Sequence, residues 1–283
     1  MAATLLHNCN EFMNYTDEIF KELLKLQDVI NKIHFGENDV RKYYFGMLKS
    51  ILLGYYHGYL SFETGNKILI NQSMLEALKF NPNQLQLLTQ AFSSENSNHT
   101  YFSHHHRNLI ISSWSAFETL VTTVCETILP SEIKTELLSF QYDEIKKKFK
   151  LEENGEMRKK FSINHLTHVP MPRKCNKLFS FLENYSGSRK EDKRFLSLFG
   201  DFRNTIHTNF IYYGSKTNEY QFGETKFIFT PNKVVRYSFN SSTPYSPLVY
   251  LNLVNNLIAI SAKIIFAINF PNEIPYSDLN AMK

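Results

Sequence analysis

The stretch at residues 102–129 carries apolar side chains at helical spacing and contains no glycine or proline. The apolar positions are Leu109, Ile110, Trp114, Phe117, Leu120, Val121, Val124 and Ile128. This spacing places them along one side of an α-helix, and such a side is buried against other elements. Pro130 follows directly and ends the helix, because proline lacks a backbone N–H donor. The chain is therefore expected to fold around this long helix.

Glycine and proline are scarce in the 283 residues, at 10 and 9 copies, which favours long helices over a protein of strands and turns. Further helices are expected at residues 11–34, 40–62, 73–80, 82–92, 131–150, 176–185, 192–211 and 248–270. Runs of β-type residues occur at 220–222, 226–230 and 234–239, with turn signals at Gly223 and Pro231-Asn232. We therefore predict a mainly α-helical bundle with a small β-hairpin near residues 220–240.

Three glycines, Gly46, Gly54 and Gly58, recur within the helix expected at 40–62. Each glycine inside a helix costs about 1 kcal/mol relative to alanine. Close packing against a neighbouring helix is therefore expected at these positions.

The most polar linker of the chain is residues 93–99, Ser-Ser-Glu-Asn-Ser-Asn-His. We place the boundary between two parts there, an N-terminal helical region at 1–98 and a helical domain at 99–283 that contains the hairpin. The two parts are not expected to be independent, because helices as apolar as these need partners to cover them.

Net charge, cysteine content and hydropathy limit the partners and the cellular environment expected for this protein. The net charge is +4 and the pI near 8.7, which permits an anionic partner without requiring one. Three widely separated cysteines indicate reduced thiols in a cytoplasmic protein. The most apolar stretch, 248–270, argues against a membrane span because it carries Asn252, Asn255, Asn256 and Lys263.

An arginine and a histidine stand four positions apart in the stretch 199–209, at Arg203 and His207. In a helix both lie on one face, about one turn apart. The arginine can hold the charge of a phosphodiester, and the imidazole can give or take a proton near neutral pH. The alternative is a structural pair near a helix C-terminus, where the dipole favours cations.

Trp114-x3-Glu118 on the long helix and Arg203-Asn204-x2-His207 on a later one are followed by the hairpin and a closing helix. This order resembles a HEPN domain (higher eukaryotes and prokaryotes nucleotide-binding). The resemblance implies a compact helical bundle that dimerises. It also implies that an Arg-polar-x-His motif from each copy meets at the dimer interface and forms a ribonuclease site without metal or cofactor. The Arg-to-His spacing here is shorter than the family's usual one.

The resemblance covers residues 103–270 and implies a role for each motif residue. His207 would be the general acid or base at the RNA 2′-OH or the leaving 5′-oxygen. Arg203 would bind the phosphate and offset charge in the transition state. Asn204 would orient the phosphate or the histidine, and Glu118 would hold Arg203 or His207 by a charge-assisted hydrogen bond. A requirement for the 2′-OH would restrict cleavage to RNA.

Two other clusters are candidates for RNA binding. Three consecutive histidines, residues 104–106, point in different directions on a helix and make no metal site, but with Arg107 they could line a nucleic-acid groove. Lys146, Lys147 and Lys148 could bind the RNA backbone. A solvated helix surface is the alternative for both. His165-x2-His168-x6-Cys175 offers too few ligands for a zinc site.

The sequence contains no P-loop, GxGxxG, HExxH or nucleophile-elbow motif, so kinase, dehydrogenase, zinc protease and hydrolase functions have no support. The expected function is a metal-independent endoribonuclease of a prokaryotic defence or toxin–antitoxin system. It would act on RNA as a homodimer, with an antitoxin or sensor protein as a candidate partner. The alternatives are a non-catalytic scaffold or regulatory subunit whose N-terminal helices bind a partner, and a nucleotide-binding protein in which Arg203 grips a phosphate.

Overall fold

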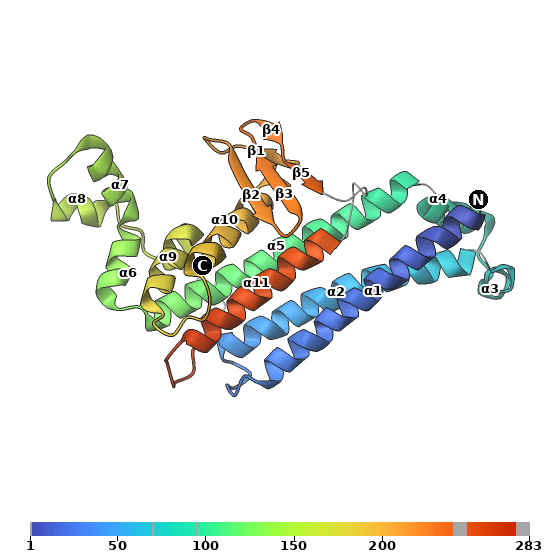
Figure 1. The fold of residues 1–283 in the computed structure, drawn as a ribbon, viewed down its shortest axis with the longest axis horizontal. Helices are drawn as coiled ribbons and strands as arrows, with labels where there is room; N and C mark the ends of the chain where they lie inside the picture. The colour runs from blue at the N-terminus through green and yellow to red at the C-terminus, as the bar shows by residue number, and fades with distance from the viewer. Residues whose placement is uncertain (1, 70, 94, 240–247, 276–283) are drawn as a thin grey trace.

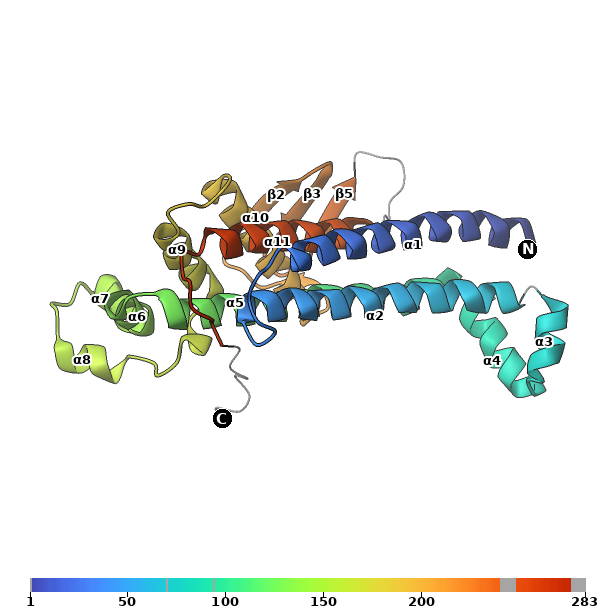
Figure 2. The same cartoon turned by 90° about the horizontal axis from the view of Figure 1, so that it is seen from below.

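A computed structural model describes residues 2–69, 71–93, 95–239 and 248–275, with side chains from residue 15 onward except 91–102 and 238–239. Four long helices run side by side and give the molecule its elongated shape (Figures 1 and 2). They are α1 (Ala2–Asn31), α2 (Val40–Leu69), α5 (Glu95–Ile128) and α11 (Leu248–Ala267). The predicted mainly α-helical fold is confirmed.

The long helix expected from the sequence is α5, and its apolar side lies in the core. Phe117, Leu120 and Val121 have no exposed surface. Helix α4 ends at Ser93 and α5 begins at Glu95. Most of the polar linker predicted at 93–99 is therefore helical. One hydrophobic core extends from α1 and α2 across α5 to α11, so the regions 1–98 and 99–283 share their core.

The shorter helices lie at the two ends of the bundle and along α5 (Figure 1). At one end are α3 (Gln72–Leu78) and α4 (Pro82–Ser93), and at the other α6 (Ser131–Leu138), α7 (Phe140–Phe149) and α8 (Gly155–Lys160). A short 3-10 helix, η1 (Leu166–His168), leads to α9 (Met171–Phe181) and α10 (Arg189–Ile206). The single helix predicted at 131–150 is thus divided at the buried Ser139.

The β region contains more than the predicted hairpin. Its strands are β1 (Ile211–Tyr212), β2 (Asn218–Phe222), β3 (Thr225–Phe229), β4 (Lys233–Val234) and β5 (Arg236–Phe239). The hairpin is β2–β3, joined at Gly223, whose φ of 55° favours glycine. β5 adds a third antiparallel strand, and β1 pairs with β4. The inward face of β3 packs on α10, where Phe227 meets Phe202 edge to face at 5.6 Å.

The glycines of α2 differ in their surroundings. Gly58 is buried, and a Cβ added there would lie 2.7 Å from Cε1 of His105 on α5. A Cβ at Gly46 or Gly54 would meet no atom within 4 Å, and both residues are exposed. The expected close packing is therefore present at Gly58 and missing at the other two.

A fully buried ion pair between Asp39 and Arg41 fixes the segment after α11 to the start of α2. Arg41 donates from Nη1 to the carbonyl of Phe270 (2.8 Å) and from Nη2 to that of Asn272 (2.7 Å). The backbone N–H of Ile274 donates to Oδ2 of Asp39 (2.9 Å). Each guanidinium nitrogen of Arg41 and each carboxylate oxygen of Asp39 thus has a hydrogen-bond partner, as a buried charge requires.

Helix α11 is the one helix of the described residues that is long and apolar enough to cross a membrane. Most of its side chains are buried by the bundle, and Leu253, Val254 and Leu257 have no exposed surface. A core helix of a soluble protein has this arrangement.

Candidate functional site

The Arg–His pair lies at the C-terminal end of α10. The helix begins after Ser188, whose hydroxyl accepts the backbone N–H of Glu191 (3.3 Å), and its last helical residue is Ile206. His207 is the C-cap residue and its side chain is exposed, whereas Arg203, one turn earlier, is half-buried. A helix C-terminus favours cationic side chains, so the position suits both residues.

The backbone after His207 turns sharply toward α5. Asn209 and Phe210 have φ values of 51° and 63°, a left-handed conformation that costs non-glycine residues of order 1–3 kcal/mol each. The N–H of Phe210 donates to the carbonyl of Thr205 (2.6 Å), which closes the turn. The guanidinium carbon of Arg107 on α5 lies 5.0 Å from the centroid of the Phe210 ring. The turn therefore brings Arg107 to the His207 end of α10.

Two arginines at this end of α10 have unused charge. Arg203 donates from Nη1 to Oδ1 of its neighbour Asn204 (3.1 Å). The Nε atoms of Arg203 and Arg107 are buried and have no hydrogen-bond partner within the described part of the chain. Neither arginine takes part in any of the ion pairs that the described residues form. Neither guanidinium is therefore neutralised by a carboxylate of the described residues.

Glu118 does not have the partner that the sequence suggested. Its Oε1 accepts the indole N–H of Trp114 (2.8 Å), one turn earlier on α5. Among the described side chains, no ion pair or hydrogen bond joins Glu118 to Arg203 or His207. The expectation that Glu118 holds one of them is not met, because Glu118 instead faces a separate cavity that Asn204 also lines.

That cavity, which we call the α5–α10 cavity, has a volume of about 490 Å³ and is lined by residues of α5, α9, α10 and β2. Its polar lining residues are Glu118, Asn176, Lys193, Ser197, Asp201, Asn204, Asn218 and Tyr220. Burial raises the pKa of Asp201, and hydrogen bonds to its Oδ2 from Tyr220 (2.9 Å) and Asn218 (3.2 Å) partly offset this. Cys175 also lines the cavity, and burial raises its pKa to about 12, so it is a protonated thiol.

Close contact between α5 and α10 shapes the cavity. The ring of Trp114 stacks on Phe199 at 5.4 Å between centroids, with 14° between their planes. A Cβ at Gly200 would lie 3.3 Å from Cζ2 of Trp114, so glycine lets the helices approach. This contact brings Glu118 and Asp201 to one cavity. Asp201 was missed in the sequence, although it lies two residues before Arg203, because its relation to Glu118 depends on helix packing.

The histidine cluster of α5 is divided between core and surface. His106 is buried, shares a hydrogen bond of 2.7 Å between its Nε2 and the Tyr59 hydroxyl, and stacks on Tyr250 at 4.3 Å. His105 contacts Gly58, and His104 is exposed. The three side chains diverge as expected, and only His104 and Arg107 remain candidates for a surface groove. In the part of the chain that is described, no three His, Cys, Asp or Glu side chains are placed to hold a metal ion.

The lysine run lies apart from the Arg–His pair. Lys146 is paired with Glu153, while Lys147 and Lys148 are exposed. Figure 1 shows α7 at the end of the molecule, away from the sheet that follows α10. These lysines therefore belong to a different surface from Arg203 and His207.

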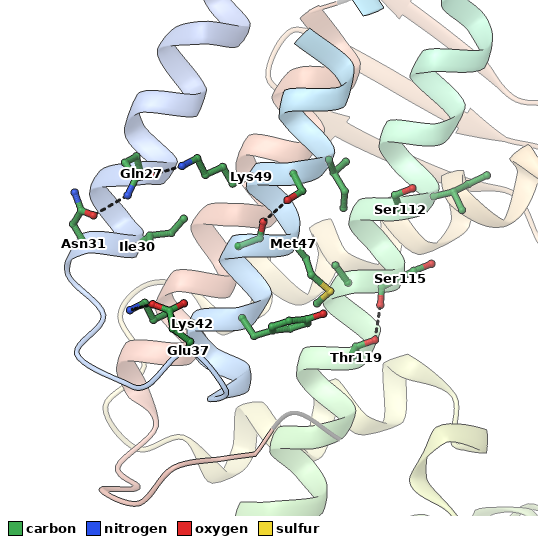
Figure 3. A pocket seen from close by; sticks show the side chains of 16 residues that line it. Gln27, Ile30, Asn31, Glu37, Lys42, Met47, Lys49, Ser112, Ser115 and Thr119 are labelled. Atoms are coloured by element: carbon green, nitrogen blue, oxygen red, sulfur yellow. Dashed lines mark hydrogen bonds and ion pairs between the residues drawn. The ribbon is translucent and has the colours of Figure 1, made fainter. Parts of the chain in front are cut away.

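A concave surface of about 970 Å³ lies across α1, α2 and α5 (Figure 3). Its polar side chains are satisfied locally: Lys49 donates to Gln27 (2.6 Å), Gln27 to Asn31 (2.8 Å), and Lys42 pairs with Glu37 (2.7 Å). None of the site residues predicted from the sequence lines it. Size alone therefore does not mark this groove as the functional site.

The end of α10 thus combines an exposed imidazole, two arginines that form no ion pair with the residues the structure describes, and an amide that accepts a hydrogen bond from one of them. Such a set can bind a phosphodiester and transfer a proton. No family model, curated protein or solved structure matches this chain.

Proposed function

We propose that the protein is a metal-independent endoribonuclease whose site is the C-terminal end of α10. The supporting observation is that His207 is exposed one helical turn from Arg203, whose guanidinium has no carboxylate partner among the described residues. An imidazole beside an unneutralised guanidinium is suited to act on a phosphate rather than to stabilise the fold.

In the proposed reaction, His207 takes the proton of the RNA 2′-OH as its oxygen attacks the adjacent phosphorus. The P–O5′ bond breaks, leaving a 2′,3′-cyclic phosphate on one fragment and a 5′-OH on the other. Arg203 stabilises the extra negative charge of the transition state, and Asn204 holds Arg203 in place through the 3.1 Å hydrogen bond.

The leaving 5′-oxygen needs a proton from a second acid. We propose that His207 of a second copy of the chain supplies it, in a composite site at a homodimer interface. The exposed position of His207 at a helix end permits such a meeting. A role in antiviral defence or as a toxin, with an antitoxin or sensor partner, is supported by the resemblance of residues 103–270 alone.

The test is cleavage of a fluorescent single-stranded RNA without metal, together with the mass of the purified protein in solution. His207→Ala and Arg203→Ala are each expected to abolish cleavage and to leave the helical circular dichroism and the dimer unchanged. His57→Ala is the matched control, because His57 is an exposed histidine on α2 outside the site. Cleavage by His207→Ala at the wild-type rate would falsify the assignment.

The two unpaired arginines also favour a second candidate, phosphate binding without cleavage. In that case nucleotides raise the melting temperature without being turned over, since a ligand that binds only the folded state stabilises it. A purified dimer that neither degrades RNA nor responds to nucleotides would instead support a scaffold or regulatory subunit.

A further inference from the structure

The α5–α10 cavity presents hydrogen-bond acceptors that are not fully used. Oε1 of Glu118 is occupied by Trp114, and Oδ2 of Asp201 by Tyr220 and Asn218. The second carboxylate oxygen of each residue has no hydrogen-bond partner among the residues that the structure describes. Two half-buried carboxylates, each with a free oxygen at one cavity, can accept N–H donors from a bound ligand.

The rest of the lining limits the ligand to a small, partly apolar one. The walls include Trp114, Met171, Leu196 and two prolines, and the volume of about 490 Å³ falls in the range of small-molecule sites. Lys193 is half-buried at the cavity and forms no ion pair with a described residue, so an anionic group on the ligand also has a partner. The lining therefore fits a heterocycle with amino groups that carries a phosphate.

We propose that the α5–α10 cavity binds a nucleobase with an exocyclic amino group, guanine above all, through the carboxylates of Glu118 and Asp201. Guanine presents N1–H and its amino group side by side, which one carboxylate accepts in a bidentate manner. Cytosine and adenine offer an amino group without that adjacent N–H. Uracil has a single N3–H between two carbonyl oxygens, so it cannot donate two hydrogen bonds to one carboxylate, and its carbonyl oxygens repel the carboxylate oxygens.

Asn204 connects this cavity with the end of α10. Its side chain lines the cavity, and its Oδ1 accepts the hydrogen bond from Arg203. A base in the cavity would therefore contact a residue that is hydrogen-bonded to Arg203. The consequence for RNA, cleavage beside a guanine, rests on the proposed ribonuclease function, whereas binding of the free nucleotide does not.

The first experiment measures binding of GMP, CMP and UMP to the full-length protein by calorimetry. GMP is expected to bind most tightly and UMP about tenfold or more weakly. Glu118→Gln keeps an acceptor for Trp114 but loses the charge, and is expected to weaken GMP binding by about tenfold. Glu219→Gln is the matched control, because Glu219 lies on β2 between Asn218 and Tyr220 with its exposed side chain paired to Lys226.

A second variant, Ser197→Trp, fills the cavity from an exposed position of α10 without changing a carboxylate. It is expected to abolish GMP binding while the circular dichroism stays that of the wild type. The proposal is overturned if GMP does not bind, or if GMP and UMP bind equally. It is also overturned if GMP binds as tightly to Glu118→Gln and Ser197→Trp as to the wild type. GMP binding in a protein that never cuts RNA sustains it and contradicts only the ribonuclease function. If the protein does cleave RNA, cuts beside guanine show that the cavity also selects the base in RNA. Cuts without base preference contradict this selection in RNA.

Discussion

Arg107 of α5 lies with its guanidinium carbon 5.0 Å from the centre of the Phe210 ring, just beyond the end of α10. A cation over an aromatic ring is held electrostatically and keeps its N–H groups free for other partners. The contact brings a residue of the long central helix to the place where α10 presents Arg203 and His207. Two elements distant in the chain thus contribute to one cationic surface.

Replacement of Arg107 by alanine is expected to weaken RNA binding. Loss of one phosphate contact reduces the slope of log affinity against log salt by about 1 and the affinity by severalfold. The measurement is fluorescence anisotropy of an RNA at several salt concentrations. Lys32→Ala is the control, because Lys32 is an exposed lysine just after α1 and belongs to no candidate RNA-binding cluster. An unchanged salt slope in Arg107→Ala would mean that Arg107 makes no phosphate contact.

Gly46 of α2 and Gly200 of α10 are expected to respond differently to an added side chain. Gly46→Ala is expected to raise the free energy of unfolding by about 1 kcal/mol, because a Cβ there meets no atom within 4 Å and alanine favours the helix. Gly200→Ala gains less, since its Cβ would press on Trp114 at 3.3 Å, and Gly200→Val destabilises by about 1–3 kcal/mol. Urea titration followed by circular dichroism measures both. A stabilising Gly200→Val would contradict the close approach of α5 and α10.

Lys174 is a buried cation on α9 whose Nζ donates to the Thr122 hydroxyl (2.6 Å). Burial lowers its pKa below the ordinary value of 10.5. In the window between the lowered and the ordinary pKa the unfolded chain binds more protons, so stability rises with pH there. Lys174→Met is expected to remove this rise and to stabilise the protein at pH 7 by about 1 kcal/mol.

Thermal unfolding of Lys174→Met between pH 7 and pH 10.5 measures the effect. The control is Lys177→Met, whose lysine forms a surface ion pair with Glu136 and is expected to change stability by less than about 1 kcal/mol. A strong loss of stability in Lys174→Met would show that the ammonium group is needed in the core.

Arg41→Ala is expected to destabilise the protein by about 3–5 kcal/mol, because it leaves Asp39 as an uncompensated buried charge. Burial alone would raise the pKa of Asp39, but hydrogen bonds from Arg41 and the backbone N–H of Ile274 outweigh it and lower the pKa below 3.8. The stability contributed by the Asp39 carboxylate is present above pH 3.8 and is lost as the pH falls through the lowered pKa.

Denaturant unfolding at neutral and acid pH tests the contribution of the Asp39–Arg41 ion pair to stability. The deficit of Arg41→Ala is expected to shrink in acid, where Asp39 takes up a proton and no longer needs the guanidinium. Lys42→Ala, which removes a neighbouring cation paired with the exposed Glu37, is expected to cost less than about 1 kcal/mol. Equal losses of stability in Arg41→Ala and Lys42→Ala would argue against a special role of the buried ion pair.

The sequence determined the helices because their signals are local. Apolar spacing gave α5 and α11, Pro130 marked the end of α5, and a four-residue interval put Arg203 and His207 on one face of α10. Local signals were weaker where a helix breaks in the core, as at Ser139, and where two-residue strands such as β1 pair only through distant β4.

Only the tertiary structure decided which distant side chains meet. Glu118 shares a cavity with Asp201 because Gly200 lets α5 and α10 approach, and Arg107 reaches Phe210 because the backbone turns after His207. Such contacts depend on the packing of whole helices, which sequence spacing within one helix does not specify. The sequence by itself thus placed an Arg–His pair at the end of a helix, and the fold added Arg107 and the cavity lined by Glu118 and Asp201 beside it.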